Sequence, residues 1–161
     1  MIGDKMRKKM NEQIKHELDS AYLYRAMAAY FHSVDWNGMA SWMLHQADEE
    51  EEHAMKFFHH IIEREGRVEL LGLKEPNLSW DNSLGAWKDA LAHEKFITGR
   101  INELMKLAVE EKDYPAIILL KWFIDEQVEE ERSVHEVVKI LDRINRDPGA
   151  MYELDNRLAK R

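Results

Sequence analysis

The sequence Asp-Glu-Glu-Glu-Glu-His at residues 48–53 decides how this chain folds. An α-helix turns by about 100° per residue, so the five consecutive acids from Asp48 to Glu52 cannot all lie on one solvated face. Glu50 and His53 fall on the same near-heptad stripe as the apolar residue Phe57. We therefore expect both polar side chains to point into the core.

Burial of Glu50 and His53 requires compensation, because a buried carboxylate or imidazole is costly unless it is paired, hydrogen-bonded or bound to a metal. Residues at positions i and i+3 project from the same helix face. A carboxylate oxygen with an imidazole nitrogen suits iron, manganese or zinc. The alternative is a solvated run of charge beside a histidine that is satisfied within the core, and the motif alone does not separate these interpretations.

Composition narrows the class of protein. The chain has 161 residues, 45% apolar and 34% charged, with only three prolines and seven glycines, which predicts a single all-α domain. The net charge of −8 disfavours nucleic acid as the main partner and suits cation binding. Without cysteine, metal chemistry must use carboxylates and imidazoles. No apolar run has the length of a signal peptide or membrane span, so we expect a cytoplasmic protein without a membrane partner.

Turn-forming residues divide the chain into helical segments. Short turns make neighbouring helices antiparallel, and the long aperiodic stretch after the second helix predicts a crossover between the ends of the bundle. We expect Asp35 or Asn37 to cap the second helix, which should end at Gly66. The expected helices of this one domain, residues 1–161, are 5–33, 37–65, 82–111, 115–144 and 148–158.

Polar residues interrupt the apolar stripe of the first hairpin at one level. Glu17 lies 18 residues before Asp35, which marks the turn. Glu50 and His53 follow Asp35 by 15 and 18 residues. In an antiparallel pair these three polar side chains are therefore level with one another.

The second hairpin repeats this arithmetic. Glu94 lies 19 residues before Asp113, while Gln127 and Glu130 follow Asp113 by 14 and 17. Packing the two hairpins together merges both polar belts into one buried cluster. Four carboxylates and one imidazole suit two divalent metal ions that share a bridging carboxylate.

The chain carries, in order, the motifs Asn11-Glu12-Gln13 to Glu17, Tyr24, Glu49 to His53, Glu94, Asp113-Tyr114-Pro115 and Glu126 to Glu131. With these motifs the whole chain resembles the bacterial-type non-haem ferritins. The resemblance implies a ferritin-like four-helix bundle with a long crossover and a short fifth helix, assembled as a homo-oligomeric hollow cage of twenty-four subunits. It further implies a ferroxidase that oxidises Fe(II) with O₂ or peroxide and stores ferric mineral, for iron storage and detoxification.

The resemblance also implies two iron ions within each subunit and no haem. It makes Gln127 a weak ligand or a neighbour of the ligands. Tyr24, seven residues after Glu17, is implied to form a hydrogen bond near the irons and to donate an electron, although its spacing alone equally fits a core tyrosine. The implied iron ligands are Glu17, Glu50 and His53 for the first ion, and Glu50, Glu94 and Glu130 for the second.

A third iron site is implied by three further acids. Glu49, Glu126 and Glu129 match the third site of prokaryotic ferritins. Their spacing alone favours the alternative interpretation, in which they form part of a solvated helix face.

Related classes fit the sequence less well. Bacterioferritins bind haem through a methionine two residues before the motif histidine, where this chain has Glu51, and they carry a second Glu-x-x-His. Rubrerythrin-like peroxidases add a cysteine-ligated iron, and the small DNA-protecting cages lack both this intrahelical cluster and the fifth segment. From another class, a helical interaction module would bind the same metals structurally, without consuming oxygen.

Apolar residues outside the stripes support assembly. The segment 150–158 and the side chains of Trp36, Trp42 and Trp80 would be poorly hidden on a lone bundle. The short segment is also too short to be stable alone, so we expect it to dock on another part of the structure.

Overall fold

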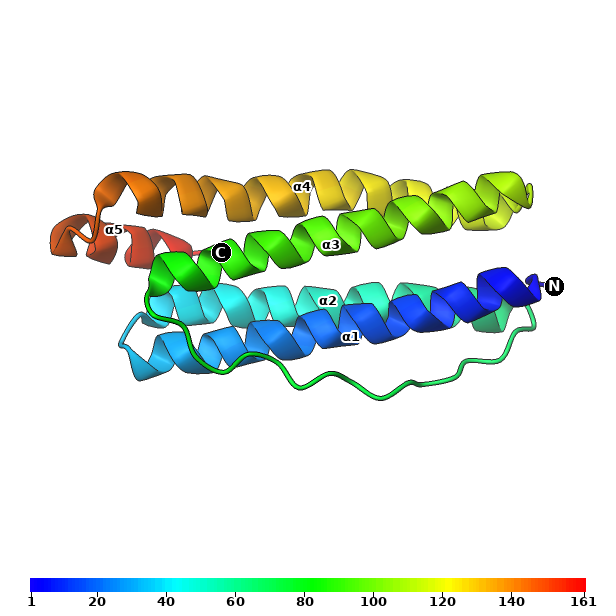
Figure 1. The fold of residues 1–161 in the computed structure, drawn as a ribbon, viewed down its shortest axis with the longest axis horizontal. Coiled ribbons are helices and arrows are strands. Elements are labelled where there is room, and N and C mark those ends of the chain that lie inside the picture. Colours follow the sequence, from blue (N-terminus) through cyan, green and yellow to red (C-terminus); the bar gives the residue numbers. More distant parts are fainter.

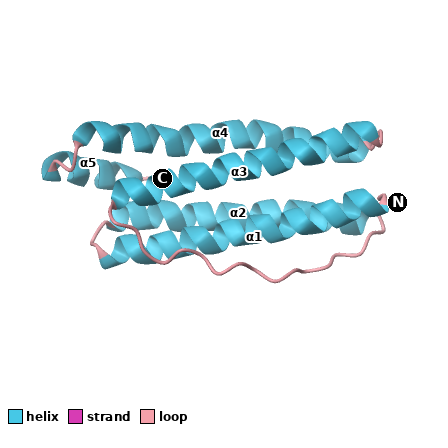
Figure 2. Cartoon of the chain, in the orientation of Figure 1, coloured by secondary structure: helices cyan, strands magenta, loops and turns pink.

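The computed structural model describes residues 1–161 as an all-helical bundle without strands (Figures 1 and 2). The predicted fold class is confirmed, and the observed helix bounds differ from the expected ones by at most two residues. No helix combines the length and apolarity needed to cross a membrane. The helices are α1 (Asp4–Ser33), α2 (Asn37–Glu63), α3 (Ser83–Glu110), α4 (Tyr114–Ile144) and α5 (Pro148–Leu158).

The apolar stripes of the long helices form two separate clusters of buried residues. One cluster of 19 residues lies at the α5 end and includes Trp87 and Met151. The other, of 15 residues, lies at the end that holds the N-terminus and includes Met6 and Phe123. Polar residues are buried between the two clusters, at mid-length of the bundle, so the core itself marks the level of the candidate site.

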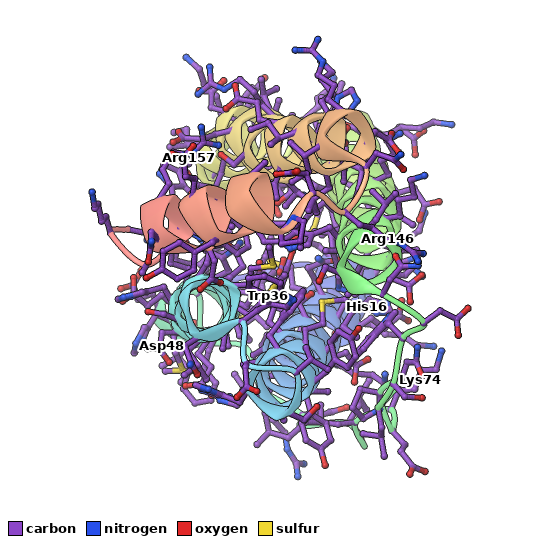
Figure 3. The ribbon with its side chains drawn as sticks, turned by 90° about the vertical axis from the view of Figure 1, so that its left-hand side faces the viewer. His16, Trp36, Asp48, Lys74, Arg146 and Arg157 are labelled. Carbon is purple, nitrogen blue, oxygen red and sulfur yellow. The ribbon has the colours of Figure 1, made fainter.

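The expected crossover links α2 to α3 along the outside of the bundle (Figure 1). Figure 3 looks from the α5 end and shows this segment, marked by Lys74, beside α1 and α3. The Asn11 side chain donates to Arg67 O (3.1 Å) and accepts from Glu69 N (2.9 Å), while Asp19 accepts from Lys74 N (2.7 Å). Side chains of α1 therefore form hydrogen bonds with backbone N–H and C=O groups of the crossover, which has no secondary structure of its own.

The starts of α3, α4 and α5 are each capped by the side chain of the N-cap residue, which is Asp147 for α5. Asn82 Oδ1 accepts from Gly85 N at 2.9 Å at the start of α3. Asp113 Oδ1 accepts from Ala116 N at 3.2 Å at the start of α4. Each side chain satisfies one of the backbone amides that a first helical turn leaves without a partner.

The ends of α2 differ from expectation. Trp36, rather than Asp35 or Asn37, is the N-cap residue, and its side chain makes no capping hydrogen bond. At the other end the helix stops at Glu63, and Glu65 adopts the left-handed conformation (φ 58°) that we expected for Gly66. Because Glu65 adopts the left-handed conformation, Gly66 is not needed for it, and Gly66 packs closely against Ile61.

The missing cap of α2 comes from α5. Asp155 Oδ2 accepts from Gly38 N at 3.0 Å, and Asp155 Oδ1 accepts from Met39 N at 2.8 Å. A Cβ atom on Gly38 would lie 1.8 Å from the Asp155 carbonyl oxygen, so only glycine permits this approach. The expected docking of α5 is therefore confirmed, and its docking surface lies within the same subunit.

The burial of Trp42 corrects one expectation about the surface. Its side chain is only 5% exposed and packs 4.7 Å from the ring centroid of Trp87, inside the core. Trp36 and Trp80 are half-buried, as expected for residues at the edge of the bundle. Trp42 therefore stabilises the subunit and does not contribute free apolar surface.

We predict that Asp155→Ala weakens the start of α2 without unfolding the bundle. Loss of a capping carboxylate costs about 1 kcal/mol, so amide hydrogen exchange at Gly38 and Met39 should accelerate about fivefold. Exchange measured by mass spectrometry on α2 peptides checks this. Asn156→Ala, at an exposed neighbouring position, is the control, and unchanged protection in the Asp155 variant would contradict the capping role.

Candidate metal centre

The four long helices each contribute one buried carboxylate at the middle of the bundle. The predicted alignment of the two hairpins is thus present in the structure. All four glutamates and the single histidine are at most 4% exposed. They are Glu17 on α1, Glu50 and His53 on α2, Glu94 on α3 and Glu130 on α4.

The first group of potential ligands is formed by α1 and α2. Ligand atoms of Glu17, Glu50 and His53 all lie within 4.8 Å of one another. His53 Nδ1 is 3.4 Å from Glu50 Oε2, while Glu17 Oε2 and His53 Nδ1 are buried without any hydrogen-bond partner. Buried polar atoms are rarely left unpaired. This group therefore has the oxygen and nitrogen donors of a metal site, with two of its atoms not engaged in hydrogen bonds.

The second group surrounds Glu94. The Tyr24 hydroxyl donates to Glu94 Oε1, and Gln127 Nε2 donates to Glu94 Oε2 at 3.2 Å. Gln127 Nε2 also lies 3.3 Å from Thr98 Oγ1. In this arrangement Gln127 turns its amide nitrogen towards Glu94, so it acts as a donor that orients the carboxylate.

Two further glutamines support the carboxylates and were not singled out as site residues from the sequence. Gln46 Nε2 donates to Glu50 Oε1 at 3.1 Å and to Glu130 Oε2 at 2.6 Å. Gln13 Nε2 donates to Glu17 Oε1 at 2.8 Å. A signal was available, because each glutamine precedes a site glutamate by four residues and side chains at that spacing meet on a helix.

The three acids of the implied third site are only partly brought together. Glu126 Oε1 lies 3.9 Å from His53 Nε2, and Glu126 forms a second potential ligand group with His53 and Glu130. Glu49 and Glu129 belong to no such group. Glu129 is exposed, and the Glu49 carboxylate is paired with Arg161.

Burial shifts the protonation of the carboxylates. Desolvation, with repulsion from Glu50, raises the pKa of Glu17 to about 8. Desolvation raises the pKa of Glu130 to about 8, helped by Glu94, and that of Glu94 to about 7. Desolvation also raises the pKa of Glu50 well above its ordinary value, with added repulsion from Glu94 and Glu130. Without cations, the cluster therefore holds protons at neutral pH.

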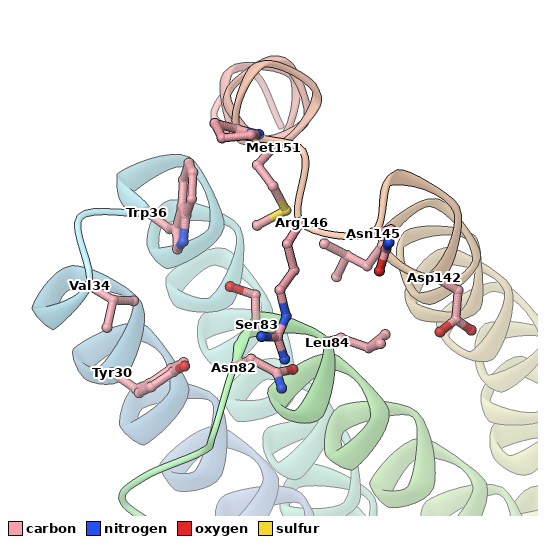
Figure 4. A pocket seen from close by; sticks show the side chains of 12 residues that line it. Tyr30, Val34, Trp36, Asn82, Ser83, Leu84, Asp142, Asn145, Arg146 and Met151 are labelled. Carbon is pink, nitrogen blue, oxygen red and sulfur yellow. The ribbon is translucent and has the colours of Figure 1, made fainter.

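A cavity elsewhere in the molecule does not share this chemistry. About 600 Å³ in volume, it lies at the end of the bundle where α5 begins, between residues such as Tyr30, Trp36 and Met151 (Figure 4). Arg146 points into it beside Asn82. None of the buried carboxylates lines this cavity, so the mid-bundle cluster remains the candidate site.

The fold and the cluster together define a ferritin-like protein, the class in which the helices of a four-helix bundle direct carboxylates and Glu-x-x-His motifs inwards. The sequence model of the ferritin-like domain family matches residues 7–144. The bacterial non-heme ferritin of Staphylococcus aureus is 34% identical over 161 residues, which cover all of this chain and 97% of the relative. That of Staphylococcus haemolyticus is 35% identical over the same coverage. The chain belongs to the ferritin family, and its relatives are the bacterial non-haem ferritins.

Solved structures agree with this assignment. The open pore ferritin from the hyperthermophilic archaeon Archaeoglobus fulgidus is 43% identical and superposes with a TM-score of 0.99, covering 100% of this chain and 99% of that one. A humanized archaeal ferritin is 42% identical, with a TM-score of 0.99 and coverage of 100% and 98%. The subunit fold is thus that of ferritin cages.

We predict that the metal-free protein loses stability as the pH rises from about 5 to about 8. The folded-state pKa values of Glu17 and Glu130 are about 8 and that of Glu94 is about 7, against an ordinary value of 4.5. Over this interval the unfolded chain releases protons that the folded chain retains, so stability falls and then levels off above the folded-state values. Thermal unfolding of chelator-treated protein measures the profile.

Glu17→Gln provides the matched test of this pH dependence. The amide has nearly the same shape as the carboxyl group but does not titrate, so the slope of the profile should become shallower. An unfolding midpoint that rises over this interval, or a slope unchanged in the variant, would contradict the assignment of raised pKa values.

Proposed function

We propose that this protein is a ferroxidase that oxidises Fe(II) with O₂ or peroxide and stores the ferric product within a cage of identical subunits. One observation carries the proposal: Glu17, Glu50 and His53 offer ligand atoms within 4.8 Å of one another, and Glu17 Oε2 and His53 Nδ1 are buried without a hydrogen-bond partner. Such atoms are compensated when a cation binds between them.

Two Fe(II) ions per subunit account for the donor set. Glu17, Glu50 and His53 would hold the first ion, in line with their mutual spacing of at most 4.8 Å. Glu50 would bridge to a second ion held by Glu94 and Glu130. Gln127 and Gln46 would orient these carboxylates, to which their amide nitrogens donate.

The raised pKa values of the cluster connect binding with redox chemistry. Fe(II) displaces the protons that the empty cluster retains, so binding releases protons and stabilises the folded protein. Each bound Fe(II) then supplies one electron, and two ions supply two of the electrons that dioxygen accepts. Carboxylate oxygens are hard ligands that favour the Fe(III) product over Fe(II).

Tyr24 and Glu126 have supporting places in this proposal. The Tyr24 hydroxyl donates to Glu94, and burial together with that carboxylate raises its pKa well above the ordinary value, so the phenol stays protonated. Tyr24 would thereby keep Glu94 oriented and stand close enough to donate an electron. Glu126, near His53 and Glu130, would receive an ion that leaves the pair, with Glu49 and Glu129 completing a third position.

Storage requires an assembly that encloses a volume. The relatives reported above are ferritins, one of them described as an open pore ferritin. Large apolar side chains are exposed on the single subunit, and contacts between subunits of a cage would cover some of them. They include Leu70 (70%), Leu78 (65%), Ile118 (75%) and Val128 (67%).

A structural metal site is the competing function. The neutral donors around the cluster would stabilise such a site equally well. The two functions differ in turnover, because a structural site binds Fe(II) without consuming O₂. Addition of Fe(II) to anaerobic protein, followed by air, separates binding from oxidation.

We predict that Glu94→Ala slows Fe(II) oxidation by at least about tenfold while the bundle stays folded. The variant removes a carboxylate of the second ion position and the acceptor of the Tyr24 hydrogen bond. Oxygen consumption and the absorbance of the ferric product measure the rate. Glu110→Ala, an exposed carboxylate on the same helix, is the control, and a full rate in the Glu94 variant would remove Glu94 from the site.

We further predict that the protein sediments as a closed particle of about twenty-four times the 19.1 kDa chain mass. Electron microscopy should show a hollow shell, and iron loading in air should add electron-dense cores to it. A stable monomer that still oxidises Fe(II) would refute storage while leaving the ferroxidase site intact.

A further inference from the structure

Arg161 lies against α2 at the edge of the candidate metal centre. After α5 the chain makes one more turn, in which Lys160 N donates to Arg157 O at 3.2 Å. The guanidinium then sits over the ring of Trp42, 4.3 Å from its centroid. Arg161 Nη1 donates to Gln46 Oε1 at 2.8 Å, and Nη2 donates to Glu49 Oε2 at 2.5 Å.

The three partners of Arg161 lie on one surface of α2 because of their spacing in the sequence. Trp42, Gln46 and Glu49 stand at positions i, i+4 and i+7, so they share one face of α2. A planar guanidinium can stack on an aromatic ring and direct separate N–H groups to two acceptors, which an ammonium cannot. The Arg161 side chain is 29% exposed and that of Glu49 is 44% exposed, so this contact is partly sheltered from water.

Gln46 connects Arg161 to the iron-binding carboxylates. It is completely buried, and its amide nitrogen donates to Glu50 and Glu130. A side-chain amide has one oxygen acceptor and one nitrogen donor group. With Arg161 at the oxygen, the nitrogen is fixed towards the cluster.

The same contact holds Glu49 away from its acidic neighbours. Glu49 belongs to no group of converging ligand atoms, whereas Glu126 converges on His53 and Glu130. The carboxylate of Glu49 is instead directed to the Arg161 guanidinium. The carboxylate that a metal ion would need at Glu49 is therefore already paired with a positive charge of the protein itself.

We propose that Arg161 competes with a third divalent cation for Glu49, so that the third ion binds only when the arginine leaves. This inference rests on the proposed function, in which Glu49, Glu126 and Glu129 receive iron from the diiron pair. Arg161 sets the affinity of that third position for the ion. Because Arg161 also holds Gln46, filling of the third position changes the hydrogen bonds that Gln46 donates to Glu50 and Glu130.

The test is a calorimetric titration of metal-free protein with Zn²⁺, which does not undergo redox chemistry. The apparent affinity for the third ion scales with the fraction of molecules in which Glu49 is not paired with Arg161. If the arginine pairs with Glu49 for about nine-tenths of the time, the weakest Zn²⁺-binding step should become about tenfold tighter in Arg161→Ala. Arg157→Ala is the matched control, because Arg157 is an exposed arginine on α5 (Figure 3) and its loss removes the same charge without freeing Glu49.

A double-mutant cycle with Glu49→Gln assigns the effect to the contact. In the Glu49→Gln background, Arg161→Ala should leave the third step unchanged, and anomalous diffraction should place a third Zn²⁺ at Glu49 only in the single Arg161 variant. Equal third-step affinity in wild type and Arg161→Ala, equal tightening in Arg157→Ala, or persistence of the effect without Glu49 would each overturn the proposal.

The outcome is separable from failure of the proposed function. If the wild type oxidises Fe(II) normally and the Zn²⁺ titrations do not differ, Arg161 does not compete and the ferroxidase stands. If the wild type consumes no O₂ with Fe(II), the ferroxidase proposal fails, and the Zn²⁺ titrations still decide whether Arg161 competes for Glu49.

Discussion

The burial of four carboxylates at one level of the bundle is the constraint on which the rest of the structure depends. Such a layer cannot be stabilised by apolar packing, and its negative charges repel one another when water is excluded. The core is accordingly split into apolar clusters of 19 and 15 residues on the two sides of the layer. Packing at both ends of the helices stabilises the fold and holds the polar middle in place.

Neutral donors, rather than positive charges, support the carboxylates within this layer. Gln13, Gln46 and Gln127 each donate an amide N–H to a glutamate, and Tyr24 donates its hydroxyl. A buried arginine or lysine would cancel the negative charge that attracts a cation. The guanidinium of Arg161 stays at the rim instead, where it meets the layer only through Gln46. These donors orient the carboxylates while Glu17 Oε2 and His53 Nδ1 keep no hydrogen-bond partner, so the cluster can still accept a metal ion.

Periodicity and turn positions were sufficient to predict the helices and the level of the site. Glu17, Glu50, Glu94 and Glu130 interrupt apolar stripes, and counting residues from each turn places them together without any tertiary information. Outside this polar layer, the sequence did not predict which side chains of distant segments would meet. Trp42 looked like a surface residue because its neighbours Trp87 and Tyr24 lie on other helices.

The same limit applies to Glu49 and to the start of α2. Helical spacing identified Glu49 as an acid near the cluster, but its pairing with Arg161 spans 112 residues. Local capping rules favoured Asp35 or Asn37, yet in the folded chain the packing of α5 places the carboxylate of Asp155 against the free amides of α2. Local sequence rules therefore predict the cap of a helix only where no distant segment supplies one.

The capping of α2 by Asp155 has a consequence for the order of folding during synthesis. The first turn of α2 is translated 117 residues before the side chain that completes it, so its amides are satisfied by water until Asp155 has been translated and has left the ribosome. The hairpin of α1 and α2 can form early from its own contacts. Closure at this end is a late, long-range event, which couples completion of the helix that carries Glu50 and His53 to the arrival of α5.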